Sequence, residues 1–247
     1  MAVTAEKIAH LRAVLSKPDL APQLSGVRLG DVAVDAVLKD GLHPALHEVF
    51  APPGHEVAAT GFAVGLARRL APEKCVLWVM QEFSAREYAG LCATGLLEFG
   101  LSPSRLIMLS ARHVEDALRA AGDALTCKGL GAVIIEINGN PKVLNLTATR
   151  RLLLASEQHG VAALLVRLGA EEEASAAETR WRVSGACSDK NADLWGEPVF
   201  DVRLIRNRHG RTGRWRMAWS CDDGRFRTAE ASGTVVSLSS GREAEAA

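Results

Sequence analysis

A turn at residues 51–60 (APPGHEVAAT) holds the side chains with the most specific chemical meaning in this sequence. Such a turn, between a strand and a helix, binds nucleotide when it reads G-x-x-x-x-G-K-[ST], because its main-chain N–H groups cradle phosphate and its lysine neutralises the charge. Aligned without gaps, Glu56 takes the second glycine position, Val57 the lysine position and Ala58 the hydroxyl position. A carboxylate there repels phosphate, and the missing lysine removes charge-assisted contacts of roughly 1.5–3 kcal/mol each.

Two further positions of a nucleotide-hydrolysing site are altered as well. The run 75–80 (CVLWVM) is followed by Gln81, where an acid that activates water is expected, and a glutamine cannot accept a proton. Glu136, in the run AVIIEI, could hold Mg²⁺, but a structural role is favoured without phosphates to share the ion. We therefore expect no catalytic residue, no metal and no cofactor. The degenerate nucleotide site is predicted at Gly54, His55, Glu56, Val57, Ala58, Gln81 and Glu136.

An arginine-rich stretch near the C-terminus is the second candidate site. Its arginines, at positions 203, 206, 208, 211, 214, 216, 225 and 227, are balanced only by aspartates at 201, 222 and 223, and two tryptophans are interleaved. Three interpretations remain open: a solvated hairpin whose arginine stems cover its own core, a contact surface for a protein partner, or a nucleic-acid patch. The contact candidates are Arg206, Arg208, Arg211, Arg214 and Trp215.

The elements that must position these residues alternate between strands and helices. Apolar runs predict strands at residues 46–50, 75–80, 106–109, 132–137 and 161–166, and helical spacing predicts helices at residues 56–70, 85–99, 113–124 and 146–159. Continuous apolar runs are typical of strands that are buried on both faces. This alternation favours a parallel sheet with helices on both sides.

The pattern changes after residue 170. Residues 179–184, 199–205 and 214–219 alternate apolar with polar side chains, as half-exposed antiparallel strands do, and a glycine-containing connection (RNRHGRTG) joins the last two. We therefore predict an α/β fold with a RecA-like core. Its mostly parallel central sheet is flanked by helices, and antiparallel strands are added at the C-terminal side.

Three segments are expected along the chain. Residues 1–30 form an arm, with a short amphipathic helix at residues 5–16 and a Pro- and Gly-containing linker from residue 18. Residues 31–228 form the degenerate RecA-like domain. Residues 229–247 have too little apolar mass to fold and are expected to be a disordered tail.

Composition excludes several classes of protein. Lys+Arg and Asp+Glu each number 29, so no overall basic field attracts nucleic acid. The five cysteines are an odd number without a C-x-x-C pair, which argues for a reducing compartment and against a disulfide framework or a zinc site. Without a signal peptide or a run of 18 apolar residues, the chain is expected to be cytoplasmic and to make no membrane contact.

Six short segments, in their order along residues 42–228, resemble the ImuA family, the SulA/RecA-like mutagenesis proteins of bacteria. None of them is a catalytic signature, so the resemblance depends on their order and on the missing lysine. The segments are 46–49 (LHEV), 76–79 (VLWV), 129–135 (GLGAVII), 146–153 (LTATRRLL), 160–165 (GVAALL) and 179–183 (TRWRV).

The resemblance implies a role in the SOS response to DNA damage. ImuA proteins act with ImuB, an inactive relative of the Y-family polymerases, and with an error-prone replicative-type polymerase in mutagenic translesion synthesis. The chain would then be a non-catalytic adaptor that binds an ImuB-type protein and also RecA, with mostly indirect contact with DNA. The alternative is a divergent RecA-like NTPase or single-stranded-DNA-binding protein.

The resemblance also bears on the DNA contacts of RecA-like proteins. In RecA filaments, two lysines spaced by one residue near the end of a late strand reach the neighbouring subunit's phosphate, and Arg206 and Arg208 occupy the matching place. The two DNA-binding loops are shortened to about residues 138–143 and 169–177, and the second contains three consecutive glutamates. The resemblance therefore implies that a RecA-like grip on DNA is lost.

Overall fold

The computed structural model of the chain describes residues 26–82, 91–188 and 196–229. The helix expected at residues 5–16, most of the expected linker, and the tail beyond residue 229 lie outside the described residues. The division into arm, domain and tail therefore stays a prediction.

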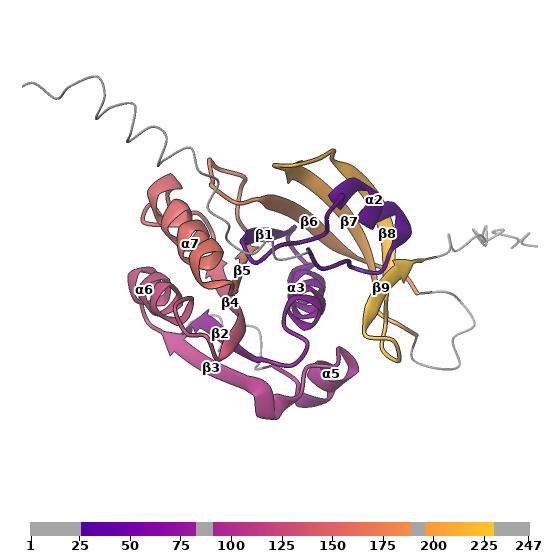
Figure 1. Ribbon diagram of the computed structural model, residues 1–247, viewed down its shortest axis with the longest axis horizontal. Helices are drawn as coiled ribbons and strands as arrows, with labels where there is room; N and C mark the ends of the chain where they lie inside the picture. Colours follow the sequence, from indigo (N-terminus) through magenta and orange to yellow (C-terminus); the bar gives the residue numbers. More distant parts are fainter. Residues whose placement is uncertain (1–25, 83–90, 189–195, 230–247) are drawn as a thin grey trace, which may run out of the picture.

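A mixed sheet organises the described part of the chain (Figure 1). Its strands are β1 (Leu46–Ala51), β2 (Cys75–Gln81), β3 (Leu106–Ala111), β4 (Leu130–Asn138), β5 (Ala162–Leu168), β6 (Thr179–Ala186), β7 (Val199–Asn207), β8 (Gly213–Ser220) and β9 (Arg225–Thr228). They lie in the order β3-β2-β4-β5-β1-β6-β7-β8-β9.

The type of strand pairing changes once across this sheet, from parallel to antiparallel. From β3 to β6 each strand is parallel to its neighbour, and from β6 to β9 each is antiparallel. The predicted α/β fold, with a mostly parallel sheet and antiparallel strands at the C-terminal side, is confirmed. The segment 179–184, expected to be antiparallel, pairs in parallel with β1 and antiparallel with β7, so β6 joins the two halves of the sheet.

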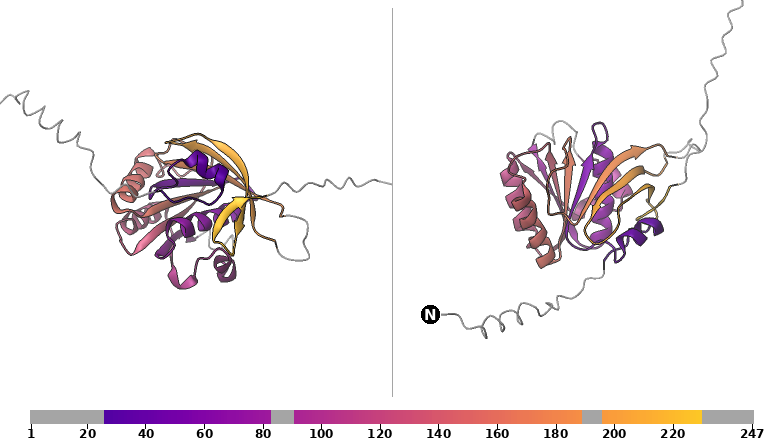
Figure 2. Two further views of the ribbon diagram at one scale, coloured as in Figure 1. Left: turned by 45° about the vertical axis from the view of Figure 1, so that its right-hand side comes forward. Right: turned by 90° about the horizontal axis from the view of Figure 1, so that it is seen from above.

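Helices cover both faces of the sheet (Figure 2). They are α2 (Val32–Leu38), which contacts β8 and β9 of the antiparallel half, and α3 (Glu56–Leu70), α5 (Ala93–Glu98), α6 (Val114–Ala124) and α7 (Leu146–His159), with a 3₁₀ turn at Pro103–Arg105. One face carries α6 and α7, and the other carries α3, α2 and α5. This is the two-sided cover that an α/β alternation predicts.

Of the helix expected at residues 85–99, only Ala93–Glu98 is helical within the described part. Leu91 and Cys92 are not helical, and α5 begins only at Ala93. Leu91 contacts the core from a non-helical segment, so its apolar side chain does not mark a helix face. Gly100, at φ 72°, follows α5 and adopts a conformation that ends a helix.

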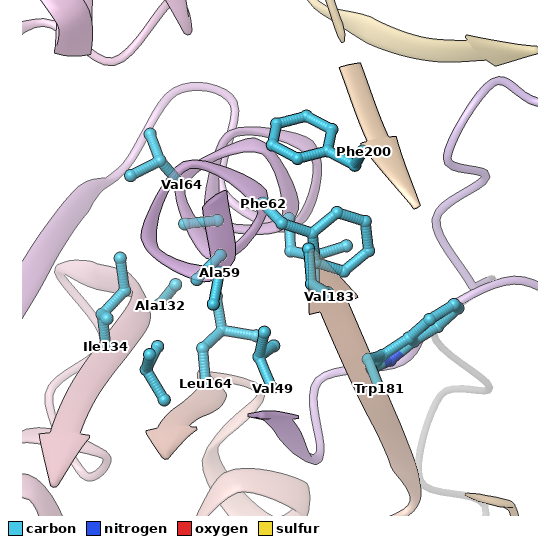
Figure 3. Close-up of a cluster of buried hydrophobic side chains, with 14 of the residues drawn as sticks. Val49, Ala59, Phe62, Val64, Ala132, Ile134, Leu164, Trp181, Val183 and Phe200 are labelled. Carbon is cyan, nitrogen blue, oxygen red and sulfur yellow. The ribbon is translucent and has the colours of Figure 1, made fainter. Parts of the chain in front are cut away.

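The side chains of alternate strand residues lie in two separate hydrophobic cores. In β4, Ile134 faces α3 and Ile135 faces α6 and α7. Figure 3 shows Phe62 of α3 among side chains of β6 and β7, and its ring centroid lies 5.6 Å from that of Trp181 and 5.9 Å from that of Phe200. These aromatic contacts fix α3 against both the parallel and the antiparallel strands.

The first described residues pack on the domain. Leu29 is fully buried, and Val27 and Leu42 exchange main-chain hydrogen bonds of 2.7 and 2.9 Å. Asp31 caps α2 through the Ala33 N–H at 2.9 Å and accepts a bond from Thr228 of β9 at 2.7 Å. Residues 26–30, within the expected linker, are therefore held against the far end of the sheet.

Within the described ranges, no helix is long and apolar enough to cross a membrane. The five cysteines are all free thiols.

Candidate functional site

The turn between β1 and α3 has its amide groups occupied from within. Its four residues run from Pro52 to His55, and neither proline has an N–H to offer. The Gly54 N–H donates to Glu56 Oε1 at 3.1 Å, and the His55 N–H donates to the Pro52 carbonyl at 3.0 Å. A phosphate at this turn would therefore find no unoccupied main-chain donor between residues 52 and 55, and the Glu56 carboxylate holds the place of an anion.

Apolar residues occupy the aligned lysine and hydroxyl positions. Val57 is 84% exposed on the first turn of α3, and Ala58 follows it. The exposed valine supplies no charge to a ligand in front of the helix. His55 Nδ1 accepts a hydrogen bond from the Gly185 N–H at 3.1 Å, which ties the turn to β6.

Glu136 and Gln81 lie on neighbouring strands but face different surroundings. Glu136 is 7% exposed and points to the α3 side of β4, where it lines a cavity beside the turn. Gln81, the last residue of β2, accepts a 2.8 Å bond from the Asn138 N–H through its side-chain oxygen and is absent from the cavity wall. The glutamine at the water-activating position thus joins the ends of β2 and β4.

The cavity at the carboxyl edge of the parallel strands measures about 730 Å³. Ligands of open α/β sheets bind at this edge. It brings together most of the degenerate site predicted from sequence: Gly54, His55, Glu56, Val57, Ala58 and Glu136.

Sequence reasoning missed the apolar walls of this cavity. Phe99, from the segment after α5, and Phe200, from the start of β7, face one another across the chain with ring centroids 6.4 Å apart. They are 101 positions apart along the chain, and no local pattern couples them. Their pairing depends on β7 folding back beside β6.

The arginine hairpin between β7 and β8 lies at the opposite edge of the sheet from the cavity. Asn207 pairs with Thr179, at the start of β6, whereas the turn follows the end of the parallel strand β1. Arg206 Nη1 donates to the Ser175 carbonyl at 2.7 Å, and Arg208 and Arg211 are exposed. The cavity and the hairpin are therefore two separate surfaces.

The last two hairpin candidates are partly committed to the fold. Arg214 forms a two-pronged ion pair with Asp201, with 2.8 Å between Nε and Oδ1, and the bonded guanidinium holds the pKa of that carboxyl below its ordinary value. Trp215 is half-buried and packs on the core. Of the five predicted contact residues, Arg206, Arg208 and Arg211 are thus exposed and are less constrained by bonds to the rest of the fold than Arg214 and Trp215.

A row of arginines crosses the exposed face of the antiparallel half. Arg182 of β6 pairs with Arg203 of β7, which pairs with Arg214 of β8. Like charges placed directly opposite one another destabilise a sheet. Arg182 is balanced by Glu172 and Arg214 by Asp201, and the side chain of the central Arg203 makes no hydrogen bond or ion pair with the described residues.

Two buried polar groups near the start of β1 serve the fold. His47 donates from Nε2 to the His43 carbonyl at 2.9 Å and accepts at Nδ1 from the Thr179 hydroxyl at 2.8 Å. That hydroxyl in turn accepts from Trp181 Nε1 at 2.7 Å, which fixes the direction of the chain of bonds. Burial lowers the pKa of His47 to about 4, so the ring is neutral near pH 7.

The second group is a buried ion cluster. The fully buried Glu48 lies 2.6 Å from Arg180 Nε and 3.9 Å from Arg167 Nη1. Both guanidinium groups lie over the Phe50 ring, at 5.0 and 5.7 Å from its centroid. The cluster joins β5, β1 and β6, and none of its three charged residues lines the cavity.

Comparison with known proteins extends these observations. No protein-family model matches the chain. Two proteins named ImuA, from two strains of Caulobacter vibrioides, are each 34% identical to it over 172 residues, which cover 64% of this chain and 66% of theirs. The match thus spans just under two thirds of the length of these relatives. Among solved structures, that of the RadB recombinase aligns with a TM-score of 0.55 and 16% identity, over 83% of this chain and all of that one, which supports the RecA-like fold alone.

Proposed function

We propose that this chain, a homologue of the ImuA proteins of Caulobacter with a RecA-like fold, is a non-catalytic adaptor of damage-induced mutagenic translesion synthesis. Its proposed partners are an ImuB-type polymerase-like protein, RecA and an error-prone replicative-type polymerase. It acts in the cytoplasm, and its contact with DNA is mostly indirect.

The observation that carries this proposal is the self-occupied turn. Glu56 accepts the Gly54 N–H, and Val57 stands where a cation would grip triphosphate. Each charge-assisted bond lost to phosphate is worth roughly 1.5–3 kcal/mol, so several such losses would reduce nucleotide affinity by orders of magnitude. A RecA-like scaffold with this turn is suited to binding proteins.

The proposed partner contact is the arginine hairpin. Arg206, Arg208 and Arg211 are exposed at one edge of the sheet, Arg214 is exposed on β8, and Trp215 is half-buried next to it. Arginine and tryptophan are enriched at the centres of protein interfaces because both bury a large area and still make polar bonds. An acidic surface on the partner would complement this hairpin.

The test is co-purification from damage-treated cells. The tagged full-length chain is captured and probed for the ImuB-type protein of the same organism and for RecA. Both proteins are expected in the eluate, and an Arg119→Glu variant, altered at an exposed arginine of α6 remote from the hairpin, should retain them. A correctly folded chain that captures neither partner would refute the adaptor.

The alternative function, a divergent NTPase or single-stranded-DNA-binding protein, has two observations in its favour. Glu136 keeps a carboxylate beside the turn, and Arg182, Arg203 and Arg214 form a row that could face a phosphate backbone. Phosphate release stimulated by single-stranded DNA and lost in Glu136→Ala would displace the adaptor.

A further inference from the structure

The outer face of the antiparallel half carries one exposed arginine on each of three neighbouring strands (Figure 1). Arg182 of β6, Arg203 of β7 and Arg214 of β8 form this arginine row, and residues that alternate with them, such as Val183 and Val202, lie in the core on the α3 side. Because the strands of a sheet are about 4.8 Å apart, the row spans roughly 10 Å. A short segment of polypeptide is long enough to reach all three side chains.

Carboxylates of the protein itself neutralise the two ends of the arginine row. Arg182 is paired with Glu172, and Arg214 forms the two-pronged ion pair with Asp201. The central Arg203 has no such partner among the described residues, and its guanidinium is exposed. Like charges on directly opposed residues repel one another, and a bound carboxylate relieves that repulsion. The centre of the row is therefore suited to an additional carboxylate.

The segment between β5 and β6 shows that this face holds an acidic stretch of chain. Glu171 is anchored by Asn140, whose side chain donates to the Glu171 carbonyl at 3.0 Å and accepts from the Glu171 N–H at 2.7 Å. The next residue, Glu172, then reaches Arg182 at one end of the arginine row. An acidic segment that lies against an arginine of this face is thus already part of the fold.

The same face is poorly suited to single-stranded nucleic acid. Such sites stack the bases on aromatic side chains. The described aromatic residues of β6 to β9 all lie in the core or pack against it: Trp181, Phe200, Trp215, Trp219 and Phe226. Affinity for a phosphate backbone also grows with the number of cations that contact it, and two of the three arginines in the row are already paired. The chemistry of the face favours an acidic protein segment.

We propose that the arginine row binds an acidic segment of a partner protein, with an aspartate or glutamate carboxylate placed on Arg203. The proposal rests on the proposed function in one respect, that the chain works by binding proteins. It extends the proposed contact surface from the hairpin, through Arg214, onto the face of the sheet.

The test measures the binding of a fluorescently labelled peptide of alternating glutamate and serine residues to the full-length chain by anisotropy. The peptide should bind at low salt, and its affinity should fall as added salt screens the exposed arginines. The same peptide with glutamine in place of glutamate should not bind. Labelled oligothymidylate represents single-stranded nucleic acid in this assay and should bind more weakly than the acidic peptide.

Two substitutions with opposite expected effects locate the peptide on the arginine row. Arg203→Glu should weaken binding at least roughly fivefold, because it removes an ion pair and places a carboxylate next to the peptide. Glu172→Gln should strengthen binding roughly two- to fivefold, because it releases Arg182 for the peptide, and a purely structural defect would not do this. Arg119→Glu, at an exposed arginine of α6, is the matched control and should bind as the unaltered chain does.

Three results would overturn the proposal. They are an acidic peptide that does not bind, an affinity that Arg203→Glu leaves unchanged or Glu172→Gln fails to raise, and tighter binding of oligothymidylate than of the peptide. Where Arg203→Glu does not fold, Arg203→Gln takes its place, since it removes the charge without adding a carboxylate. Failure of co-purification with the ImuB-type protein and RecA, together with peptide binding that depends on Arg203, would refute the proposed function and leave this site standing.

Discussion

Replacing Glu48 with glutamine should cost more stability than most single substitutions. Its carboxylate is fully buried, 2.6 Å from Arg180 Nε and 3.9 Å from Arg167 Nη1, and those two side chains are 10% and 2% exposed. Glutamine keeps the volume but leaves two buried cations without a counter-charge. Breaking a buried ion pair in this way costs about 3–5 kcal/mol, a large part of the 5–15 kcal/mol typical of a folded domain.

Urea unfolding, followed by tryptophan fluorescence and far-ultraviolet circular dichroism, measures this loss. With a urea dependence near 2–3 kcal/mol per molar, the midpoint of Glu48→Gln should fall by roughly 1–2 M. Glu73→Gln is the matched control, since the Glu73–Arg105 pair is exposed and pairs of that kind are worth about 0–1 kcal/mol. Equal, small losses in both variants would refute the idea that the buried cluster holds β5, β1 and β6 together.

Three further predictions concern other parts of the molecule. The pKa of His47 is about 4 in the folded chain and near 6.5 in the unfolded chain, so the unfolded chain binds more protons between these two pH values. The free energy of unfolding should therefore fall by up to roughly 3 kcal/mol as the pH drops from about 6.5 to 4. Urea titrations in which the stability of His47→Gln depends on pH with the same slope would contradict this. Gly65→Ala places a carbon 2.6 Å from an aromatic ring and should lower stability by about 1–3 kcal/mol in thermal unfolding. In Gly122→Ala the added carbon meets nothing within 4 Å, and stability should rise by about 0.5–1 kcal/mol. Equal effects of the two substitutions would argue against tight packing under α3. Arg206→Glu combined with Arg208→Glu should weaken co-purification with the ImuB-type protein without changing the melting temperature, because both side chains are exposed, and unchanged capture would return the hairpin to a solvated surface.

The buried parallel strands could be predicted from sequence because their signal is local. In β4 every residue from Leu130 to Ile137 is buried, so the apolar run itself marks the strand. The long helices α3 and α7 could equally be predicted from sequence, since their apolar residues recur at helical spacing. In α7 the expected start and stop also agree with the caps: Asn145 accepts the Thr147 N–H at 2.9 Å, and Gly160 follows at φ 67°.

The elements that sequence reasoning missed depend on distant contacts. Helix α2 is only seven residues long and contains three valines, which are weak helix formers, and it is held by contacts with β8 and β9. Strand β9 has one buried residue, Phe226, among charged neighbours, and it forms because Trp219 of β8 is paired with it. Neither the contacts of α2 with β8 and β9 nor the pairing of β9 with β8 can be recognised from a pattern in the local sequence.

Part of the candidate site could be predicted from sequence for the same reason, because its signal is local. The defects of the turn lie within a short segment and can be read by alignment with a phosphate-binding loop. The hydrogen bond from the Gly54 N–H to Glu56, the pairing of Gln81 with Asn138 and the apolar cavity required the folded chain. Their partners are set by side-chain direction or by strand order, and neither is encoded in residue spacing.

Calorimetric titration of MgATP into the full-length chain tests the central claim most directly. With Gly54 bonded to Glu56 and no cation at Val57, we predict no saturable heat at millimolar nucleotide, and the same result in Glu136→Gln. Saturable micromolar binding that Glu136→Gln abolishes would contradict the account, because it would mean that the turn still grips a triphosphate.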